Sequence, residues 1–263
     1  MIDTLLLIRL VLAFAVGSLW VTVITIIAEK KGSVIGGILG GLPSTSAFSF
    51  LFIGINQSPA TAVEATTVFP LAFAITSAYL FFYAFFVQKG FGRGILISLL
   101  IWFTISGVVV ASGESDFALS IVSGVAISVL TYYAFTKKLK LQRLEGEEKL
   151  YKIHEVALRG VGAGALVCLS VLLSQVGGPL LGGISAAFPA VFTSTLIIMN
   201  RSKGTEFSRA MTKPLVLSGI LTIIPFSVAA RYLYPSFGVW LGTLASYALV
   251  VPLAILSYYV VKH

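Results

Sequence analysis

The chain has 263 residues, of which 57% are hydrophobic and 11% are charged, and its formal net charge at pH 7 is +8. A soluble domain carries about 25% charged residues, so this composition excludes a water-soluble protein of this length. Apolar stretches of about 20 residues recur throughout, and each is long enough to cross a bilayer as a helix. They lack the alternating segments of about 10 residues that a transmembrane β-barrel requires. The composition therefore predicts an all-α membrane protein.

The basic residues lie between the hydrophobic stretches rather than on one amphipathic face. This placement is typical of membrane topology signals and not of a nucleic-acid surface. The single cysteine, Cys168, has no second cysteine with which to form an internal disulfide. Residues 1–4 lack a basic segment and a small-residue cleavage site, so we expect the first hydrophobic stretch to be a retained helix.

We expect nine transmembrane helices, bounded by turn-prone and charged residues. They span residues 5–28, 33–55, 65–87, 93–112, 117–136, 156–174, 178–199, 211–232 and 236–260. Lys and Arg gather after the first, third, fifth and seventh helices, and Arg231 is the one exception to this pattern. The positive-inside rule then places the N-terminus outside and the C-terminus in the cytoplasm, in a multi-pass protein of the cell (cytoplasmic) membrane.

The connection 137–154 is the longest and most basic, and it also contains three glutamates. We interpret it as a solvated linker, and the alternative is a docking site for anionic lipid or for a regulator.

The sequence contains an internal repeat. Gly182 lies 146 residues after Gly36, and Pro189 lies 146 residues after Pro43. Smaller matches flank these anchors in the same order. Residues 1–112 and 154–263 are therefore predicted to be two four-helix repeats, joined by one linker helix and a basic connection over 113–153. The single linker helix would invert the second repeat relative to the first, which is an inverted-topology repeat.

The second repeat has a set of features in fixed order. They are Arg159 early in its first helix, the stretch from Gly182 and Gly183 to Pro189, and Thr205, Glu206 and Arg209 before its third helix. In these features it resembles the GlpM-like family of small four-helix bacterial membrane proteins, whose function is not established. The first repeat keeps Arg9, Gly36, Gly37 and Pro43, but Glu64 replaces the last arginine. The resemblance implies a duplicated and fused four-helix unit, and it implies no substrate.

The second and seventh predicted helices are interrupted by glycine and proline at matching positions. Such paired interruptions in inverted repeats indicate the midplane site of a transporter, and small-residue helix packing is the alternative. The predicted substrate pathway comprises Gly40, Gly41, Pro43, Ser44, Thr45, Ser46, Gly183, Pro189, Thr193 and Ser194.

Ionisable residues within membrane helices are costly, so each is a candidate functional residue. We predict two gating ion pairs, Arg9 with Glu64 and Arg159 with Glu206, because each acid is expected on the same side as its arginine. The alternative is that both arginines extend to the lipid headgroups.

The sequence contains no metal-ligand spacing, phosphate loop or nucleophile–base set, so we expect no enzyme, no metal and no cofactor. The leading hypothesis is a small secondary transporter or facilitator of a small, neutral or weakly charged solute, working by alternating access. One alternative is an ion or small-solute channel, and another is a non-transporting membrane assembly or scaffold protein.

Overall fold

The computed structural model describes residues 4–30, 42–113, 115–141 and 152–262, and these residues form helices with no strand among them. Within these described residues, six stretches are long and apolar enough to cross a membrane. They are Thr4–Ile27, Phe69–Lys89, Phe91–Ser112, Phe117–Lys137, Ile153–Lys203 and Thr205–Val260. The protein is therefore all-α, and it has the long apolar helices that the sequence predicts for a membrane protein.

The first part of the chain contains α1 (Thr4–Lys30), α3 (Ser44–Asn56), α4 (Pro59–Ala65), α5 (Phe69–Phe86), a 3₁₀ turn η1 (Val87–Lys89) and α6 (Phe91–Ser112). Next comes α7 (Phe117–Lys137). The second part contains α8 (Ile153–Ala186), α9 (Ala190–Lys203), α10 (Thr205–Ala210), α11 (Thr212–Ser218), a π-helical segment η2 (Gly219–Ile223) and α12 (Ile224–Lys262).

The boundary between α6 and α7 follows from local sequence. Gly113 ends α6 in the left-handed conformation, with φ 65°, which glycine adopts without a steric penalty. Asp116 begins α7, because its Oδ1 accepts a 2.9 Å hydrogen bond from the Leu119 N–H, and a capping carboxylate satisfies a free donor there. The predicted break between the fourth and fifth helices is confirmed.

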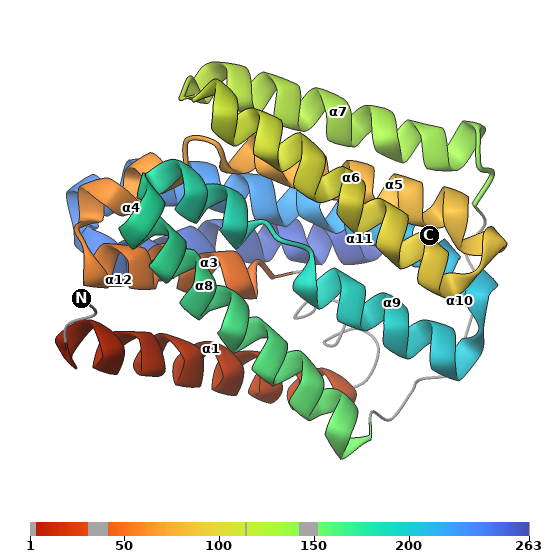
Figure 1. The fold of residues 1–263 in the computed structure, drawn as a ribbon, viewed down its shortest axis with the longest axis horizontal. Coiled ribbons are helices and arrows are strands. Elements are labelled where there is room, and N and C mark those ends of the chain that lie inside the picture. Colours follow the sequence, from red (N-terminus) through yellow and green to blue (C-terminus); the bar gives the residue numbers. More distant parts are fainter. Residues whose placement is uncertain (1–3, 31–41, 114, 142–151, 263) are drawn as a thin grey trace.

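The helices form an elongated bundle whose N- and C-terminal ends lie at opposite ends of its long axis (Figure 1). Helix α5 is central, with 67% of its most apolar stretch buried, whereas the corresponding fraction is 22% for α6 and for α7. The outer helices instead expose large apolar side chains, such as Leu96 and Val108 of α6 and Leu244 of α12. Contiguous exposed apolar surface of this kind suits contact with lipid.

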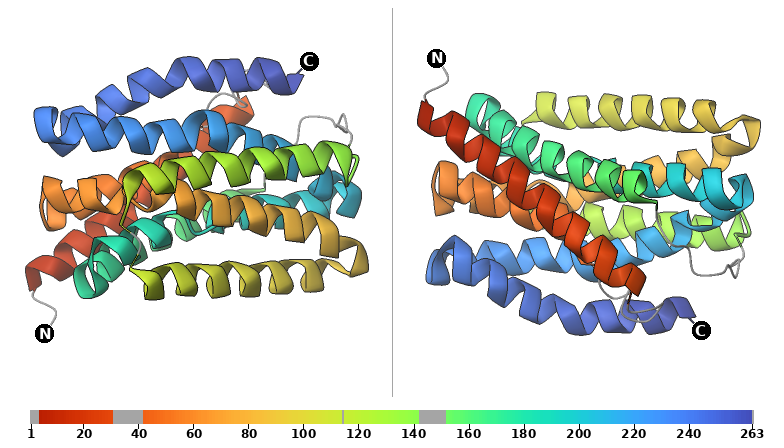
Figure 2. Two further views of the ribbon diagram at one scale, coloured as in Figure 1. Left: turned by 90° about the horizontal axis from the view of Figure 1, so that it is seen from above. Right: turned by 90° about the horizontal axis from the view of Figure 1, so that it is seen from below.

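Two long helices turn back on themselves at a glycine. Gly178 in α8 has φ 82° and ψ 176°, and Gly238 in α12 has φ 68° and ψ 174°. This region of backbone conformation is open almost only to glycine. The two arms of α12 then lie side by side (Figure 2), and the Tyr234 hydroxyl is 2.8 Å from Thr243 Oγ1 across them.

The predicted helices therefore differ from the observed ones in detail. Residues 178–199 were predicted as one helix, but the structure divides them between the second arm of α8 and α9. The predicted helix 33–55 is described only from residue 42, and its helical part begins at Ser44.

Helix α1 and the first arm of α8 pack closely through small residues. A Cβ atom added to Gly164 would collide with Ser18 and with the Phe14 carbonyl, and one added to Gly160 would collide with Thr22. Glycine at such a crossing lets two helix backbones approach, which is a common basis of helix association in membranes. These two helices run in opposite directions (Figure 1).

Candidate functional site

Two helices begin at matching breaks in the chain. Pro43 precedes α3 with φ −76° and ψ 59°, and Pro189 precedes α9 with φ −78° and ψ 38°. Proline has no side-chain acceptor, and neither helix has a side-chain cap. The first turn of a helix has N–H groups without intrahelical partners and carries a partial positive charge. Each helix start therefore carries a partial positive charge, although its first N–H group, that of Ser44 or Ala190, already donates to the carbonyl two residues earlier.

The second break is held by a chain of hydrogen bonds from α5 and α6. Thr76 Oγ1 donates to the Ala187 carbonyl at 2.6 Å, and Trp102 Nε1 donates to Thr76 Oγ1 at 3.0 Å. At the first break, the Pro43 carbonyl accepts from the Ala47 N–H at 3.0 Å and from Ser46 Oγ at 3.3 Å. The Thr76 bond satisfies the Ala187 carbonyl, as a non-aqueous surrounding requires, whereas the Pro43 carbonyl accepts the first i to i+4 bond of α3.

The two breaks line one cavity, with about 90 Å³ accessible to water-sized molecules. Residues 42–46 line it from the first break and residues 186–189, 191 and 192 from the second. Further lining comes from Val21, Ile24 and Thr25 of α1, from Phe69, Phe73 and Thr76 of α5, from Arg159 of α8, and from Leu215, Ser218 and Ile223. The cavity is thus built from both halves of the chain.

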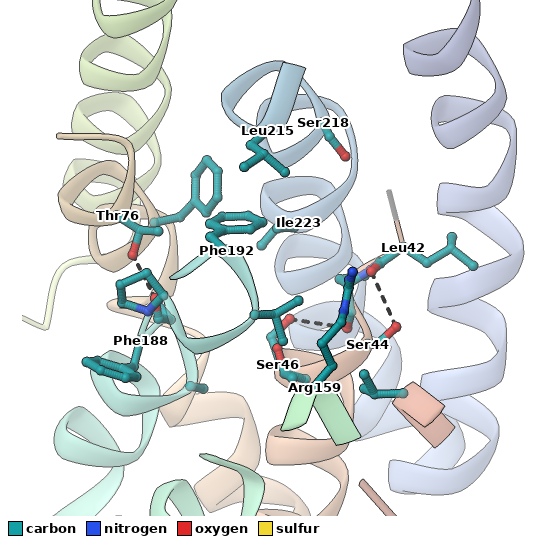
Figure 3. Close-up of a pocket in the computed structure, with 18 of the residues that line it drawn as sticks. Leu42, Ser44, Ser46, Thr76, Arg159, Phe188, Phe192, Leu215, Ser218 and Ile223 are labelled. Atoms are coloured by element: carbon teal, nitrogen blue, oxygen red, sulfur yellow. Dashed lines mark hydrogen bonds between the residues drawn. The ribbon is translucent and has the colours of Figure 1, made fainter. Parts of the chain in front are cut away.

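Hydroxyl groups and aromatic rings both line the cavity, with Ser44 and Ser46 near Arg159 and with Phe188 near Thr76 (Figure 3). Ser44, Thr45 and Ser46 supply hydroxyls at the first break, whereas Phe188 and Phe192 stand at the second. The Ser44 hydroxyl donates to the Leu42 carbonyl at 3.5 Å, which is at the weak limit of a hydrogen bond. The Ser44 hydroxyl therefore remains able to bond a ligand, whereas the Ser46 hydroxyl already donates to the Pro43 carbonyl.

Arg159 is the one charged residue among the described residues that line the cavity. It lies about two turns into α8, and its side chain points toward Leu42 and Ser44 (Figure 3). Arg159 therefore lies beside the first break and not in the ion pair with Glu206 that its sequence position predicts.

Half of the predicted pathway residues line the cavity, namely Pro43, Ser44, Thr45, Ser46 and Pro189. Gly183, Thr193 and Ser194 do not. Gly183 lies against the Ala65 carbonyl, the Thr193 hydroxyl is 2.8 Å from the Tyr79 hydroxyl, and the Ser194 hydroxyl donates to the Val191 carbonyl. Gly183 thus allows a close approach of two backbones, and the hydroxyls of Thr193 and Ser194 are used in hydrogen bonds within the protein. Gly40 and Gly41 lie outside the described residues.

Neither predicted gating pair is present in the described part of the chain. Arg9 Nη1 donates to the Asn56 carbonyl at 3.2 Å, at the end of α3, where helix carbonyls lack partners, and Glu64 is exposed. Glu206 instead pairs with Arg209, Nη1 to Oε2 3.4 Å, because residues three apart are neighbours on one helix.

Arg231, the exception to the charge pattern, has structural contacts. Its Nη1 donates to the Val63 carbonyl at 3.1 Å and to Thr67 Oγ1 at 2.7 Å, and its guanidinium carbon lies 4.2 Å from the centre of the Phe117 ring. It therefore joins α12 to the end of α4 and to the start of α7.

Several cavity residues had no signal in the sequence. Thr76 lies in a continuous apolar helix, and so does Trp102, which holds Thr76 from behind the cavity; only the bonds from Trp102 to Thr76 and from Thr76 to Ala187 identify them. Phe188 directly precedes Pro189, so its position beside a predicted break was a usable clue.

Within the described residues, no group of three or more His, Cys, Asp or Glu side chains is placed to hold a metal ion. The arrangement offers instead helix N-termini, hydroxyls and one guanidinium around a small cavity. Comparisons with protein-family models, with curated proteins and with solved structures find no match to this chain.

Proposed function

We propose that the protein is a small secondary transporter or facilitator that carries a small, neutral or weakly charged solute across the cell membrane by alternating access. The observation that carries the proposal is the meeting of two helix starts, just after Pro43 and Pro189, in one cavity. Paired discontinuous helices at a shared site are the usual binding architecture of transporters built from inverted repeats.

The proposal includes the inverted repeat, with units over 1–112 and 154–263 joined by 113–153. Its support lies in contacts that recur 146 residues apart. Thr76 and Thr222 are both buried. The Thr222 hydroxyl donates to the Ser218 carbonyl four residues earlier at 2.7 Å, and Thr76 Oγ1 lies 3.2 Å from the corresponding Ala72 carbonyl while it donates mainly to Ala187. Two equivalent side chains thus face the equivalent carbonyl of their own helix.

The short helices α4 and α10 give a second line of support, because each contacts the other half of the chain. Arg231 of α12 donates to the carbonyl of Val63 in α4. Arg209 of α10 donates through Nε to the Ala84 carbonyl of α5 at 2.8 Å. Such reciprocal contacts are expected when two similar units face each other across an approximate two-fold axis. The duplicated GlpM-like unit remains part of this proposal.

The first test concerns topology. In a Cys168→Ser background, single cysteines replace the exposed residues Ala60 and Ser202, and a membrane-impermeant thiol reagent is added to one side of sealed vesicles. We expect Ala60→Cys to react only from outside and Ser202→Cys only from the cytoplasm. Reaction of both from one side would contradict the inverted repeat.

The second test separates a carrier from a channel. In a Cys168→Ser background, Thr45→Cys places a thiol on the cavity wall. Alternating access predicts that this thiol reacts slowly from either side, while the reagent does not cross to a cysteine on the far side. Passage of the reagent through the protein would favour the channel instead. A Thr45→Cys thiol that reacts from neither side would contradict both.

A further inference from the structure

We propose that the solute enters the central cavity sideways from the bilayer, through a second cavity between α6 and α8, and that Phe188 is the gate between the two cavities. This inference rests on the proposed transport function. It supplies the substrate class, which is an uncharged, mainly hydrocarbon molecule that dissolves in the bilayer.

The second cavity, here called the side cavity, has a volume of about 420 Å³ and lies between α6 and the two arms of α8. Large aliphatic side chains of α8 line it, among them Leu173, Leu181 and Ile184. Ligand sites in proteins are typically about 300–1,000 Å³ and mainly hydrophobic, and apolar cavities stay dry and take apolar ligands. The side cavity thus has the size and the lining of a site for a hydrocarbon molecule.

The side cavity opens on an apolar outer surface of the protein. Phe103 of α6 and Leu169 of α8 line it and are 57% and 44% exposed. Leu96 and Leu100 precede Phe103 on the same face of α6, because residues three and four apart are neighbours on a helix, and both are exposed. This surface suits contact with lipid. A molecule dissolved in the bilayer therefore meets the side cavity without passing through water.

Phe188 lines both the side cavity and the central cavity. Its ring packs against Trp102 and Phe103 of α6, with ring centres 5.1 Å and 5.7 Å apart. It lies in the link between the end of α8 at Ala186 and the start of α9 at Ala190. Rotation about χ1 moves an aromatic ring between staggered positions, and here it does so without breaking a helix. Phe188 is therefore placed to open and close a passage between the cavities.

A second contact crosses the same wall. Thr76 lines the central cavity and Trp102 lines the side cavity, and Trp102 Nε1 donates a 3.0 Å hydrogen bond to Thr76 Oγ1. The wall is therefore two side chains thick at this point. Because a hydrogen bond between buried groups is costly to break, this part of the wall stays closed. Phe188, which lies beside Thr76 (Figure 3), is then the movable part.

The route determines the class of solute. Moving a charged group from water into apolar surroundings is far more costly than moving hydrocarbon, so an entrance lined by leucine, isoleucine and aromatic rings favours an uncharged molecule. Once inside, one polar group of the solute would meet the Ser44 hydroxyl at the first break. The expected solute is therefore mainly hydrocarbon with a single uncharged polar group, such as a hydroxyl or a carbonyl.

The first test asks whether bilayer hydrocarbon enters the side cavity. The full-length protein with Trp20→Phe and Trp240→Phe keeps Trp102 as its only tryptophan. It is placed in nanodiscs of phosphatidylcholine, with or without bromine near the middle of the acyl chains, and bromine quenches indole fluorescence on contact. Trp102 is 3% exposed, whereas Trp240 is 63% exposed. We expect quenching of Trp102 comparable to that of a protein in which Trp240 is the only tryptophan. Trp102 fluorescence that brominated lipid leaves unchanged would overturn the proposal.

Filling the side cavity supplies the matched control. Gly107 lines it, and a Cβ added there meets nothing within 4 Å, so Gly107→Leu has room to occupy the space. Gly92 is an exposed glycine of the same helix whose added Cβ also meets nothing within 4 Å. Gly107→Leu should remove most of the quenching of Trp102, and Gly92→Leu should leave it. Equal quenching in the two variants would show that the bromine does not reach Trp102 through the side cavity.

The second test asks whether the side cavity leads to the central one. In a Cys168→Ser background, Thr45→Cys places a thiol in the central cavity. Its reaction rate is measured with N-octylmaleimide, which dissolves in the bilayer, and with a sulfonated, membrane-impermeant maleimide. Phe188→Ala should raise the ratio of the first rate to the second by up to about tenfold, the change in population that loss of an aromatic contact allows. Gly107→Leu should lower the ratio, and Gly92→Leu should not.

A ratio that is the same in Phe188→Ala, in Gly107→Leu and in their parent would overturn the side entrance, even if Trp102 is quenched. If Phe188→Ala fails to fold, Phe188→Leu removes the ring with a smaller loss of volume. The effect of Gly107→Leu then decides together with it.

The two proposals fail separately. Quenching of Trp102 and labelling controlled by Phe188, without counterflow of any solute in proteoliposomes, would keep the side entrance and remove the transporter. Counterflow of a polar solute that does not dissolve in the bilayer, at a rate that Gly107→Leu leaves unchanged, would keep the transporter and remove the side entrance.

Discussion

Thr76 and Ala187 lie 111 residues apart in the chain, yet the Thr76 hydroxyl donates a 2.6 Å hydrogen bond to the Ala187 carbonyl. This carbonyl lies just before the start of α9. A side chain in the first half of the protein therefore fixes the position of a helix start in the second half. The same hydroxyl accepts a bond from Trp102 Nε1. The geometry of the cavity therefore depends on a polar contact between the two halves.

Replacing Thr76 by Val should destabilise the protein by about 1–2 kcal/mol, because the Ala187 carbonyl and the Trp102 N–H both lose a partner away from water. Thermal unfolding of the purified protein measures the effect. Thr76→Ser keeps the hydroxyl and should recover most of the loss. Thr136→Val, at an exposed position of α7, is the control. Equal stability of Thr76→Val and the wild type would show that the bond contributes nothing.

Alanine at two neighbouring glycines of α8 should have opposite effects. A Cβ at Gly164 meets the Phe14 carbonyl and Ser18, whereas a Cβ at Gly162 meets nothing within 4 Å. Gly164→Ala should destabilise by about 1–3 kcal/mol through overpacking, and Gly162→Ala should stabilise by up to about 1 kcal/mol through helix propensity. Denaturant or thermal unfolding compares them. Effects of the same sign would contradict the close α1–α8 crossing.

Gly178→Ala should destabilise the turn within α8. Its φ of 82° with ψ of 176° is a conformation in which other residues are strained by about 1–3 kcal/mol. Gly107→Ala is the matched control, because Gly107 is helical and a Cβ there meets nothing within 4 Å. The melting temperature should fall for Gly178→Ala and not for Gly107→Ala. A Gly178→Ala protein as stable as the wild type would mean that the chain reverses elsewhere.

Arg231→Gln should reduce stability without changing topology. The variant loses charge-assisted hydrogen bonds to Val63 and Thr67 and the contact with Phe117, each hydrogen bond to a charged group contributing about 1.5–3 kcal/mol at most. Unfolding measures the loss, and labelling of Ala60→Cys in the variant reports the orientation. Inversion of the labelled side would show that this arginine is a topology signal after all.

Composition and the positions of glycine and proline determined much of this protein. Proline lacks a backbone N–H and weakens a helix that reaches it, so helix starts just after Pro43 and Pro189 are locally favoured, although Pro252 lies inside α12. The polar turn before Asp116 follows from capping in the same way. Long apolar stretches fix the helical class, because a backbone in lipid must satisfy its own hydrogen bonds.

The side-chain partners depended on the tertiary structure. Arg159 was predicted beside Glu206, but Glu206 pairs within α10 and Arg159 lines the cavity. Thr76 and Trp102 carried no sequence signal, because their role arises from a carbonyl more than 80 residues away. Local backbone preferences are encoded within a few residues. The reach of a long side chain depends on how helices distant in sequence cross, and only packing decides that.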